Sequence, residues 1–308
     1  MEPSARRYRA VLIAGPTASG KSALAIELAQ RWNGVVINAD SMQLYRELSI
    51  ITARPSAEDE ATVPHRLYGV LPSAEPFSTG DWLRLIAGEL ERSWEEESLP
   101  ILVGGTGLYF KALTEGFAEL PEIDPQVREA SRALASEGGV EAVRSALLPL
   151  DRQAADSLQD LQRLTRALEV VRSTGKTLAD WQIEAQAAPL LKAEDCLRLV
   201  LAPPRPWLHE RIARRASLML QRKGMGEVES LLELGLPSSL PAMRAIGVKE
   251  ISELLRGSIN AEEAERRLTV ATRQYAKRQE TWFRNQMGSW TRLDPAGRSP
   301  AELVDQIS

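Results

Sequence analysis

The chain has 308 residues, of which 44% are hydrophobic, and a net charge of −4. This size suits one large domain or one domain that carries an insert, and the charge gives no overall attraction to polyanions. Its single cysteine, Cys196, excludes an intrachain disulfide framework and a cysteine-based zinc site. No stretch is long and apolar enough to cross a bilayer, and the first ten residues lack the apolar run of a signal peptide, so we expect a cytoplasmic protein.

The first motif follows a short apolar stretch. Residues 11–14 (VLIA) predict a buried strand, and residues 22–32 have the apolar spacing of a helix. Between them, GPTASGKS at 15–22 matches the phosphate-binding pattern G-x-x-x-x-G-K-[ST] at every fixed position. Such a loop binds phosphate through backbone N–H groups and its lysine, while its last hydroxyl ligates Mg²⁺. The predicted phosphate-binding residues are Gly15, Thr17, Ala18, Ser19, Gly20, Lys21 and Ser22, with Ser22 as the Mg²⁺ ligand.

Two further apolar stretches end in polar or glycine-rich segments. Residues 35–38 (VVIN) predict a strand that leads to Asp40, and residues 101–103 (ILV) predict one that leads to GGTG at 104–107. Helical patterns lie between the strands, most clearly at 81–94. The alternation predicts an α/β fold with a parallel sheet flanked by helices, as in P-loop nucleoside-triphosphate hydrolases, and ligands at the carboxyl ends of the strands. We expect the strand before Asp40 to neighbour the phosphate loop.

Three roles compete for Asp40. It could bind Mg²⁺, act as a general base beside a transferred group, or cap the helix that follows, and capping is compatible with either active role. Ser41 and Gln43 are of the kind that hydrogen-bonds a base edge, although such residues are more often ordinary loop residues. The only two histidines, His65 and His209, are far apart in the sequence, which argues against a histidine metal cluster or a histidine-based nucleophile.

Strand patterns disappear between about residue 121 and residue 194, where amphipathic helical patterns follow one another. The sequence therefore predicts a P-loop core at 1–120 and 195–308 with a helical insert at 121–194. An apolar stretch at 197–204 returns the chain to the sheet. A predicted helix follows it, and one or more of its arginines could reach the phosphates. These arginines are Arg205, Arg211, Arg214 and Arg215.

Positive charge is concentrated toward the C-terminus. Residues 205–292 contain 16 Lys and Arg against 10 Asp and Glu. On a predicted helix in this region Arg273, Lys277 and Arg284 share one face, and Trp282 and Phe283 offer stacking or core surface. Such a surface suits RNA, but a stripe of charge taken alone is more often a solvated helix face. The tail after Trp290 is weakly patterned.

Taken together, these motifs resemble one family. GPTASGKS, DSMQLYREL, TARP, PHRLYGV, LVGGTGLYFKAL, DLQRLTRALEV, STGKTL, LHERIARR, MRAIGVKE and TRQYAKRQETWFR stand in the order found in bacterial tRNA dimethylallyltransferases, also called tRNA isopentenyltransferases, from about residue 11 to residue 285. One departure is Ile51, where the family usually has glycine before Thr-Ala.

The resemblance implies that a dimethylallyl group passes from dimethylallyl diphosphate to N6 of adenosine 37 in tRNA. The P-loop and Mg²⁺ would hold the diphosphate. The implied catalytic residues are Asp40 as general base, Thr106 and Arg215. The implied tRNA contacts are Asp40, Ser41, Met42, Gln43, Thr106, Arg128, Gln162, Arg163, Leu164, Thr165, Arg166, Arg244, Ala245, Ile246, Gly247, Val248, Lys249, Arg273, Lys277 and Arg284. The resemblance also implies a monomer.

Two enzymes and one binding protein remain as alternatives. A P-loop kinase of a small metabolite would use Asp40 to bind Mg²⁺ or to deprotonate a hydroxyl, but such a kinase needs no long basic helical region. A related prenyltransferase would act on free adenine nucleotides. A nucleotide-dependent module could instead bind RNA without any chemistry.

Overall fold

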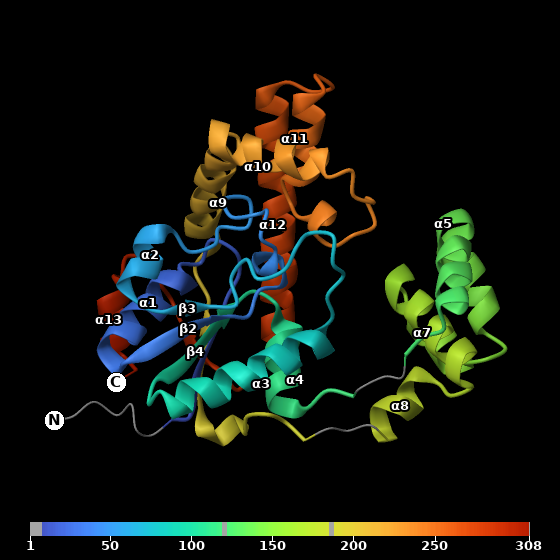
Figure 1. The fold of residues 1–308 in the computed structure, drawn as a ribbon, viewed down its shortest axis with the longest axis horizontal. Helices are drawn as coiled ribbons and strands as arrows, with labels where there is room; N and C mark the ends of the chain where they lie inside the picture. The colour runs from blue at the N-terminus through green and yellow to red at the C-terminus, as the bar shows by residue number, and fades with distance from the viewer. Residues whose placement is uncertain (1–7, 119–121, 185–187, 308) are drawn as a thin grey trace. The chain divides into compact units, whose positions relative to one another are not determined.

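The computed structural model describes residues 8–118, 122–184 and 188–307 (Figure 1). The chain divides into two compact units, a core unit within residues 1–114 and 190–308 and an insert unit within residues 115–189. The predicted start of the insert, residue 121, lies outside the described residues. Each unit has its own apolar core.

The core unit contains a six-stranded sheet in which every pairing is parallel. In spatial order the strands are β3 (His65–Arg66), β2 (Gly34–Asn38), β4 (Leu99–Gly104), β1 (Ala10–Ala14), β5 (Cys196–Leu201) and β6 (Thr291–Leu293). The α/β prediction is confirmed. The expectation that the strand before Asp40 neighbours the phosphate loop is wrong, because Ile101 of β4 pairs with Val11 on one side and with Val36 on the other.

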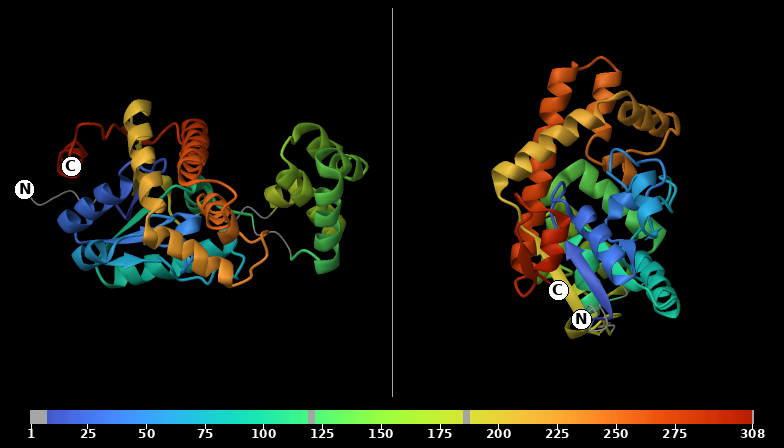
Figure 2. Two further views of the ribbon diagram at one scale, coloured as in Figure 1. Left: turned by 90° about the horizontal axis from the view of Figure 1, so that it is seen from above. Right: turned by 90° about the vertical axis from the view of Figure 1, so that its left-hand side faces the viewer.

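Helices cover both faces of this sheet (Figure 2). Because successive strand residues point to opposite faces, Leu12 of β1 packs on one side and Ile13 on the other. Helices α3 and α4 and the end of α12 cover the first face, and α1 and α13 cover the second. The helices of the core unit are α1 (Lys21–Trp32), α2 (Ala57–Thr62), α3 (Thr79–Glu95), α4 (Gly107–Glu115), α9 (Arg205–Met219), α10 (Arg222–Glu233), α11 (Val248–Leu255), α12 (Ala261–Gln286) and α13 (Pro300–Asp305).

Three short elements escape sequence periodicity. Strand β3 has two residues and β6 has three, too few for an alternating pattern to be read. Helix α13 has only six residues, too few for a helical pattern to be clear. Its start is marked by a capping box formed by Ser299 and Glu302. The tail after Trp290 is therefore part of the sheet and of its helical cover, although its sequence is only weakly patterned.

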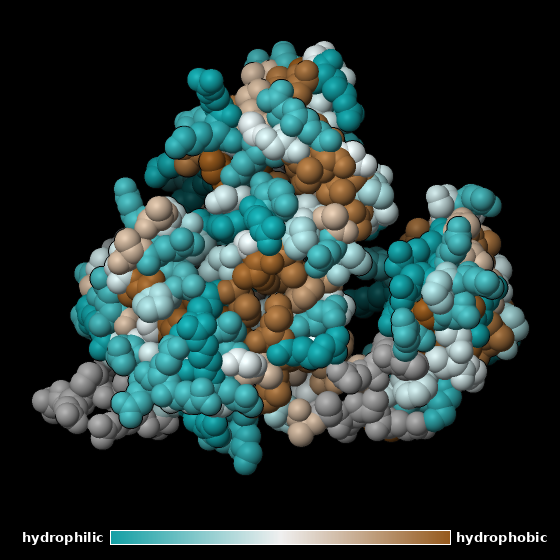
Figure 3. Space-filling view, viewed as in Figure 1, coloured by the Kyte–Doolittle hydropathy of each residue, from teal (hydrophilic) through white to brown (hydrophobic). Residues whose placement is uncertain are grey.

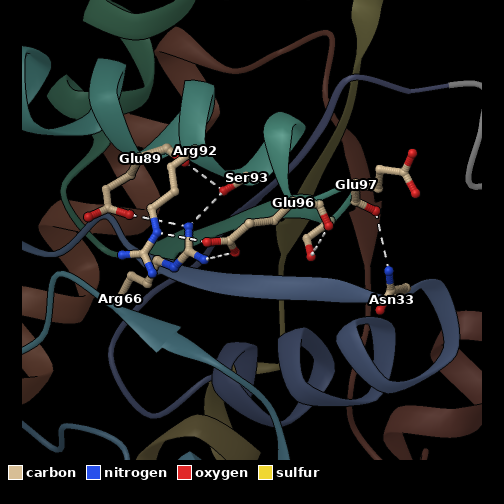
Figure 4. Close-up of polar contacts among 8 residues, drawn as sticks. Asn33, Arg66, Glu89, Arg92, Ser93, Glu96 and Glu97 are labelled. Atoms are coloured by element: carbon tan, nitrogen blue, oxygen red, sulfur yellow. Dashed lines mark hydrogen bonds and ion pairs between the residues drawn. The ribbon is translucent and has the colours of Figure 1, made fainter.

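Edge strand β3 is fastened to α3 by ion pairs (Figure 4). Arg66 lies 3.3 Å from Glu89 and 2.5 Å from Glu96, and it donates a hydrogen bond to the hydroxyl of Ser93 at 3.2 Å. On the neighbouring strand, Asn38 donates to the carbonyl of Leu67 at 3.0 Å. These contacts hold the β2 end in place, where Asp40 follows.

Helices are the only regular secondary structure among the described residues of the insert unit. Its helices are α5 (Pro125–Leu147), α6 (Arg152–Ser157), α7 (Leu161–Thr174) and α8 (Leu178–Glu184). Helix α5 is broken at Gly139, whose φ of 61° lies in the left-handed region that favours glycine. Leu147 of α5 and Leu164 and Leu168 of α7 share a small apolar core.

No helix in the described part of the chain is long and apolar enough to span a membrane. Hydrophilic side chains cover most of the face seen in Figure 3.

Candidate functional site

The loop between β1 and α1 is shaped to receive an anion. Ala18 and Gly20 have φ values of 64° and 90°, and a Cβ on Gly15 would lie 2.8 Å from the hydroxyl of Ser19. Gly20 caps α1 without a side chain, so the first N–H groups of the helix have no side-chain acceptor. Backbone donors at a helix N-terminus suit phosphate oxygens.

The carboxylate of Asp40 interacts electrostatically with two cations at this loop, Lys21 and Arg215. Burial lowers the pKa of Lys21 to about 8, while the negative charge of Asp40 raises it and the positive charge of Arg215 lowers it. Burial also lowers the pKa of Arg215, again opposed by Asp40. One carboxylate cannot neutralise both cations, so the site carries excess positive charge that an anionic ligand would balance.

Arg215 of α9 is held against the phosphate loop. Its Nη1 donates to Oγ1 of Thr17 at 2.6 Å, and its Nη2 donates to the carbonyl of Ile51 at 3.0 Å. The remaining nitrogen, Nε, and the hydroxyl of Ser19 are buried without hydrogen-bond partners among the described residues. Buried polar atoms of this kind are uncommon in folded proteins and are expected where a ligand completes the bonding.

Asp40 stands directly after β2 and caps a short 3-10 helix, η2 (Ser41–Leu44). Its Oδ1 accepts the backbone N–H of Met42 at 3.1 Å, whereas Oδ2 has no hydrogen-bond partner among the described residues. Thr106, after β4, accepts the backbone N–H of Ser41 at 2.9 Å and donates to the Ser41 hydroxyl at 3.3 Å. Asp40 therefore combines the capping role with a second carboxylate oxygen available for chemistry.

Gln43 contacts the protein itself. Its side chain is 9% exposed, and its Nε2 donates to the carbonyls of Thr52 and Ala53 at 2.9 and 2.8 Å. These bonds fix the loop whose Ile51 carbonyl holds Arg215. The amide nitrogen of Gln43 therefore has the structural role of an ordinary loop residue. Met42 is partly buried against the cluster around Ile51.

The described residues contain no group of three or more His, Cys, Asp or Glu side chains that could hold a metal ion. A hard cation at the phosphate loop would instead be bound by the exposed hydroxyl of Ser22 and by ligand oxygens. Mg²⁺ is typically bound in this way, through few protein groups plus phosphate oxygens.

Relatives of known function match nearly the whole chain. Residues 43–286 match the family model described as IPP transferase, and residues 8–72 match the one described as isopentenyl transferase. The chain belongs to the IPP transferase family. The tRNA dimethylallyltransferase of Agrobacterium fabrum is 48% identical over 94% of this chain and 98% of its own length, and that of Rhizobium etli is 49% identical over 92% and 96%.

Solved structures of IPP transferases show the same fold. The tRNA isopentenylpyrophosphate transferase of Bacillus halodurans superposes with a TM-score of 0.70 at 34% identity, covering 96% of this chain and 93% of the other. A eukaryotic dimethylallyltransferase, whose structures show it acting on tRNA, has a TM-score of 0.78 at 27% identity, covering 94% and 74%. The resemblance drawn from the motifs is confirmed, as is the P-loop type of fold.

The tRNA contacts implied for the core unit differ in exposure. Arg244 and Lys249 are exposed and Ile246 is partly buried. In contrast, Ala245, Gly247 and Val248 are buried, and the side chains of Ala245 and Val248 belong to the packing around α11. Arg273, Lys277 and Arg284 of α12 are all exposed. Arg284 lines a cavity of about 350 Å³ at the carboxyl end of β5, together with Arg205 and Arg292.

The insert unit divides its implied contacts in a similar way. Gln162 and Arg163 are exposed, and Arg128 and Arg166 are partly exposed. Leu164 is fully buried and Thr165 is 8% exposed, with its hydroxyl donating to the carbonyl of Leu161, so neither side chain is available for an RNA contact. Buried Glu169 pairs with Arg166 and with Arg132, each at 3.3 Å. Arg132 was missed because nothing in the sequence places it beside Arg166.

Two residues of α12 near the phosphate loop also escaped the sequence analysis. Gln279 is 6% exposed and bonds the phosphate loop. The pKa of Tyr275 is raised by burial and further by the charge of Asp40, so its hydroxyl stays protonated. A signal for Gln279 was present, because it falls in the buried stripe of α12 with Thr272, Ala276 and Phe283. A polar residue in an apolar stripe usually has a fixed partner.

Proposed function

We propose that this IPP transferase moves a dimethylallyl group from dimethylallyl diphosphate to N6 of adenosine 37 in tRNA. The observation that carries the proposal is the pair of cations, Lys21 and Arg215, beside the single carboxylate of Asp40. The cations suit the diphosphate of the donor, and the carboxylate suits the amine of the acceptor. Family membership and the tRNA-acting structural relative support this choice of substrates.

Departure of the diphosphate is the first requirement of the reaction. As the allylic C–O bond breaks, negative charge grows on the diphosphate oxygens. The N–H groups of residues 18–22, together with Lys21 and Arg215, stabilise that charge because they are already oriented toward it. Arg215 is kept in this orientation by Thr17 and Ile51.

The site suits a Mg²⁺ ion whose coordination is completed by the diphosphate. The hydroxyl of Ser22 would hold it together with diphosphate oxygens, since these are the hard oxygen donors that Mg²⁺ prefers. When bound, it supplies further neutralisation of the leaving group. Such a metal would depend on the donor for most of its ligands, because the described residues contain no group of three or more His, Cys, Asp or Glu side chains that could hold it.

Asp40 is placed to remove the proton from the acceptor. The N6 amine of adenine is a weak nucleophile because its lone pair is delocalised into the ring. As the N–C bond forms, one N6 proton passes to the free Oδ2 of Asp40, and pyrophosphate leaves with the electrons of the C–O bond. Thr106 holds the Ser41 backbone beside this oxygen. The adenine must leave the base stack to reach the site.

Exposed basic residues of both units would bind the anticodon arm through its phosphates. In the core unit these are Arg244, Lys249, Arg273, Lys277 and Arg284, and in the insert unit they are the exposed Arg163 and the partly exposed Arg128 and Arg166. We further propose that the protein works as a monomer in the cytoplasm, where tRNA is available.

An acceptor panel tests this function. The protein is incubated with Mg²⁺ and radiolabelled dimethylallyl diphosphate, and is offered tRNA with A37, the same tRNA with G37, AMP, or no acceptor. We expect label only in the A37 tRNA. Label in AMP but not in tRNA would show an enzyme of free nucleotides, and absence of label in every acceptor would contradict the proposal.

A further inference from the structure

Gln279 joins two loops of the site from the buried face of α12. Its Oε1 accepts the backbone N–H of Thr17 at 2.9 Å, and its Nε2 donates to the carbonyl of Gly105 at 3.0 Å. One bond needs an acceptor and the other needs a donor, so the orientation of the amide is fixed by the two loops. Both loops are thereby tied to one point on a helix.

The glycines after β4 make this contact possible. A Cβ on Gly105 would lie 2.2 Å from Nε2 of Gln279 and 3.0 Å from Oδ2 of Asp40. A Cβ on Gly107 would lie 2.2 Å from the ring of Trp282, one turn along α12. At 2.2 Å these atoms would overlap, so a side chain at position 105 would displace the amide of Gln279, and one at position 107 would collide with the ring of Trp282.

A continuous path runs from the phosphate loop to the carboxylate. Thr17 bonds Gln279, Gln279 bonds Gly105, and the next residue, Thr106, bonds the backbone N–H of Ser41 beside Asp40. β4 pairs with β1 on one side and with β2 on the other, so strand pairing aligns the ends of these strands, and Gln279 adds a side-chain link between the loops beyond them. Among the described residues, Gln279 is the only side chain that hydrogen-bonds both the phosphate loop and the segment after β4.

We propose that Gln279 is a positioning residue that sets the spacing between the donor-binding loop and the Asp40–Thr106 pair. The inference rests on the proposed function, which assigns the donor to one loop and the acceptor to the other. Transfer needs the allylic carbon and N6 in attack geometry, and misplacement by about 1 Å costs on the order of 100-fold in rate. Gln279 acts through Thr17 and Gly105 and touches neither substrate.

The proposed role of Gln279 can be distinguished from tRNA binding, because the residues expected to bind tRNA lie on a different side of α12. Arg273 and Lys277 lie on the exposed side of α12, whereas Gln279 lies on the buried side. Loss of the Gln279 bonds should therefore slow transfer while leaving tRNA affinity intact. A residue needed only for folding would change rate, affinity and thermal stability together.

Three variants test the inference. Gln279→Met keeps the length of the side chain without either bond, Gln279→Glu keeps the acceptor and loses the donor, and Gln274→Ala is a matched control at an exposed position of α12. We would measure the single-turnover transfer rate, the Kd values for inorganic pyrophosphate and tRNA, the Tm, and hydrogen exchange of the Thr17 amide. Both Gln279 variants should transfer on the order of 100-fold more slowly, with tRNA Kd within about twofold of the wild type.

Amide exchange at Thr17 makes the test independent of activity. We expect it to quicken at least about tenfold in Gln279→Met and to stay unchanged in Gln274→Ala. Wild-type transfer rates in the Gln279 variants, or unchanged Thr17 exchange in Gln279→Met, would overturn the inference, and so would parallel losses of rate, tRNA affinity and Tm. If the wild type itself transfers nothing, the proposed function fails, while Thr17 exchange still decides whether Gln279 holds the loop.

Discussion

Arg215 donates a hydrogen bond of 2.6 Å to the hydroxyl of Thr17, and thereby joins helix α9 to the loop between β1 and α1. A second bond from the same guanidinium reaches the carbonyl of Ile51. A planar guanidinium can make both bonds and still present Nε, whereas a lysine ammonium cannot reproduce this fork. The arrangement makes Arg215 sensitive even to a substitution that keeps its charge.

Arg215→Lys should therefore slow prenyl transfer by on the order of 100-fold, because charge on the departing diphosphate is less well stabilised. The matched control, Arg214→Lys, changes an exposed neighbour on α9 and should stay within about twofold of the wild type. Single-turnover rates with saturating tRNA measure both. Equal rates in the two variants would show that the position of Arg215 carries no special role.

Asp40→Asn separates proton removal from structure. Asparagine keeps the oxygen that caps η2, so the fold should persist, but it cannot accept a proton from N6. We expect the transfer rate to fall by about 100-fold or more, with tRNA Kd changed by less than about threefold. Filter binding and single-turnover transfer provide the two numbers, and an equal loss in both would assign Asp40 to binding.

The lowered pKa of Lys21 predicts how donor affinity depends on pH. Lys21 in the free protein is charged below its pKa of about 8 and loses its proton above it. Bound pyrophosphate favours the charged form, so its Kd should rise toward tenfold per pH unit above about pH 8. Lys21→Arg stays charged throughout and should show a flat profile over the same range. Calorimetric titration with pyrophosphate provides both profiles, and a wild-type Kd that does not rise above pH 8 contradicts this account of Lys21.

Ile51 provides packing at a position where the family usually has glycine. Its side chain is 2% exposed and lies about 3.5 Å from the point where a Cβ on Gly247 would stand. Ile51→Ala should cost about 3 kcal/mol of unfolding free energy, against less than about 1 kcal/mol for Ile50→Ala at the partly buried neighbouring position. Urea unfolding compares them. Pyrophosphate affinity should hardly change, since the hydrogen bond from Arg215 to Ile51 goes to the backbone carbonyl, which the substitution keeps.

Removal of basic residues on α12 tests the RNA surface. Arg273→Ala and Lys277→Ala should each weaken tRNA binding and lower the slope of log affinity against log salt by about 1. Gln274→Ala, neutral and exposed on the same helix, should leave the slope unchanged. An unchanged slope in the basic variants would show that this face of α12 is a solvated helix surface that does not bind RNA.

The sequence predicts the local features of the site better than their arrangement. The P-loop at residues 15–22 is a contiguous motif, so its strand, loop and helix could be read directly. The placement of β4 between β1 and β2 could not, because the order of strands depends on how the crossover helices pack rather than on any one segment. The same limit hid Gln279, whose partners lie 262 and 174 residues away in the chain.

Burial differs among the residues for which the family resemblance implies RNA contacts. A motif match assigns a role to every residue of a segment, such as residues 162–166 and 244–249, whereas a helix exposes only part of each turn. Leu164 and Val248 therefore face apolar cores, and Arg163 and Lys249 face outward. Helical spacing within these segments indicates which residues are candidates, but the direction of the buried face depends on packing.

Analysis of tRNA nucleosides after reaction tests the central claim most directly. Unmodified tRNA with A37 is incubated with the protein, Mg²⁺ and dimethylallyl diphosphate, digested to nucleosides and fragments, and examined by mass spectrometry, while released pyrophosphate is counted. The account predicts one N6-(dimethylallyl)adenosine per tRNA, located at position 37, with one pyrophosphate released for each. Pyrophosphate release without prenylated adenosine, or prenylation at another position, would contradict it.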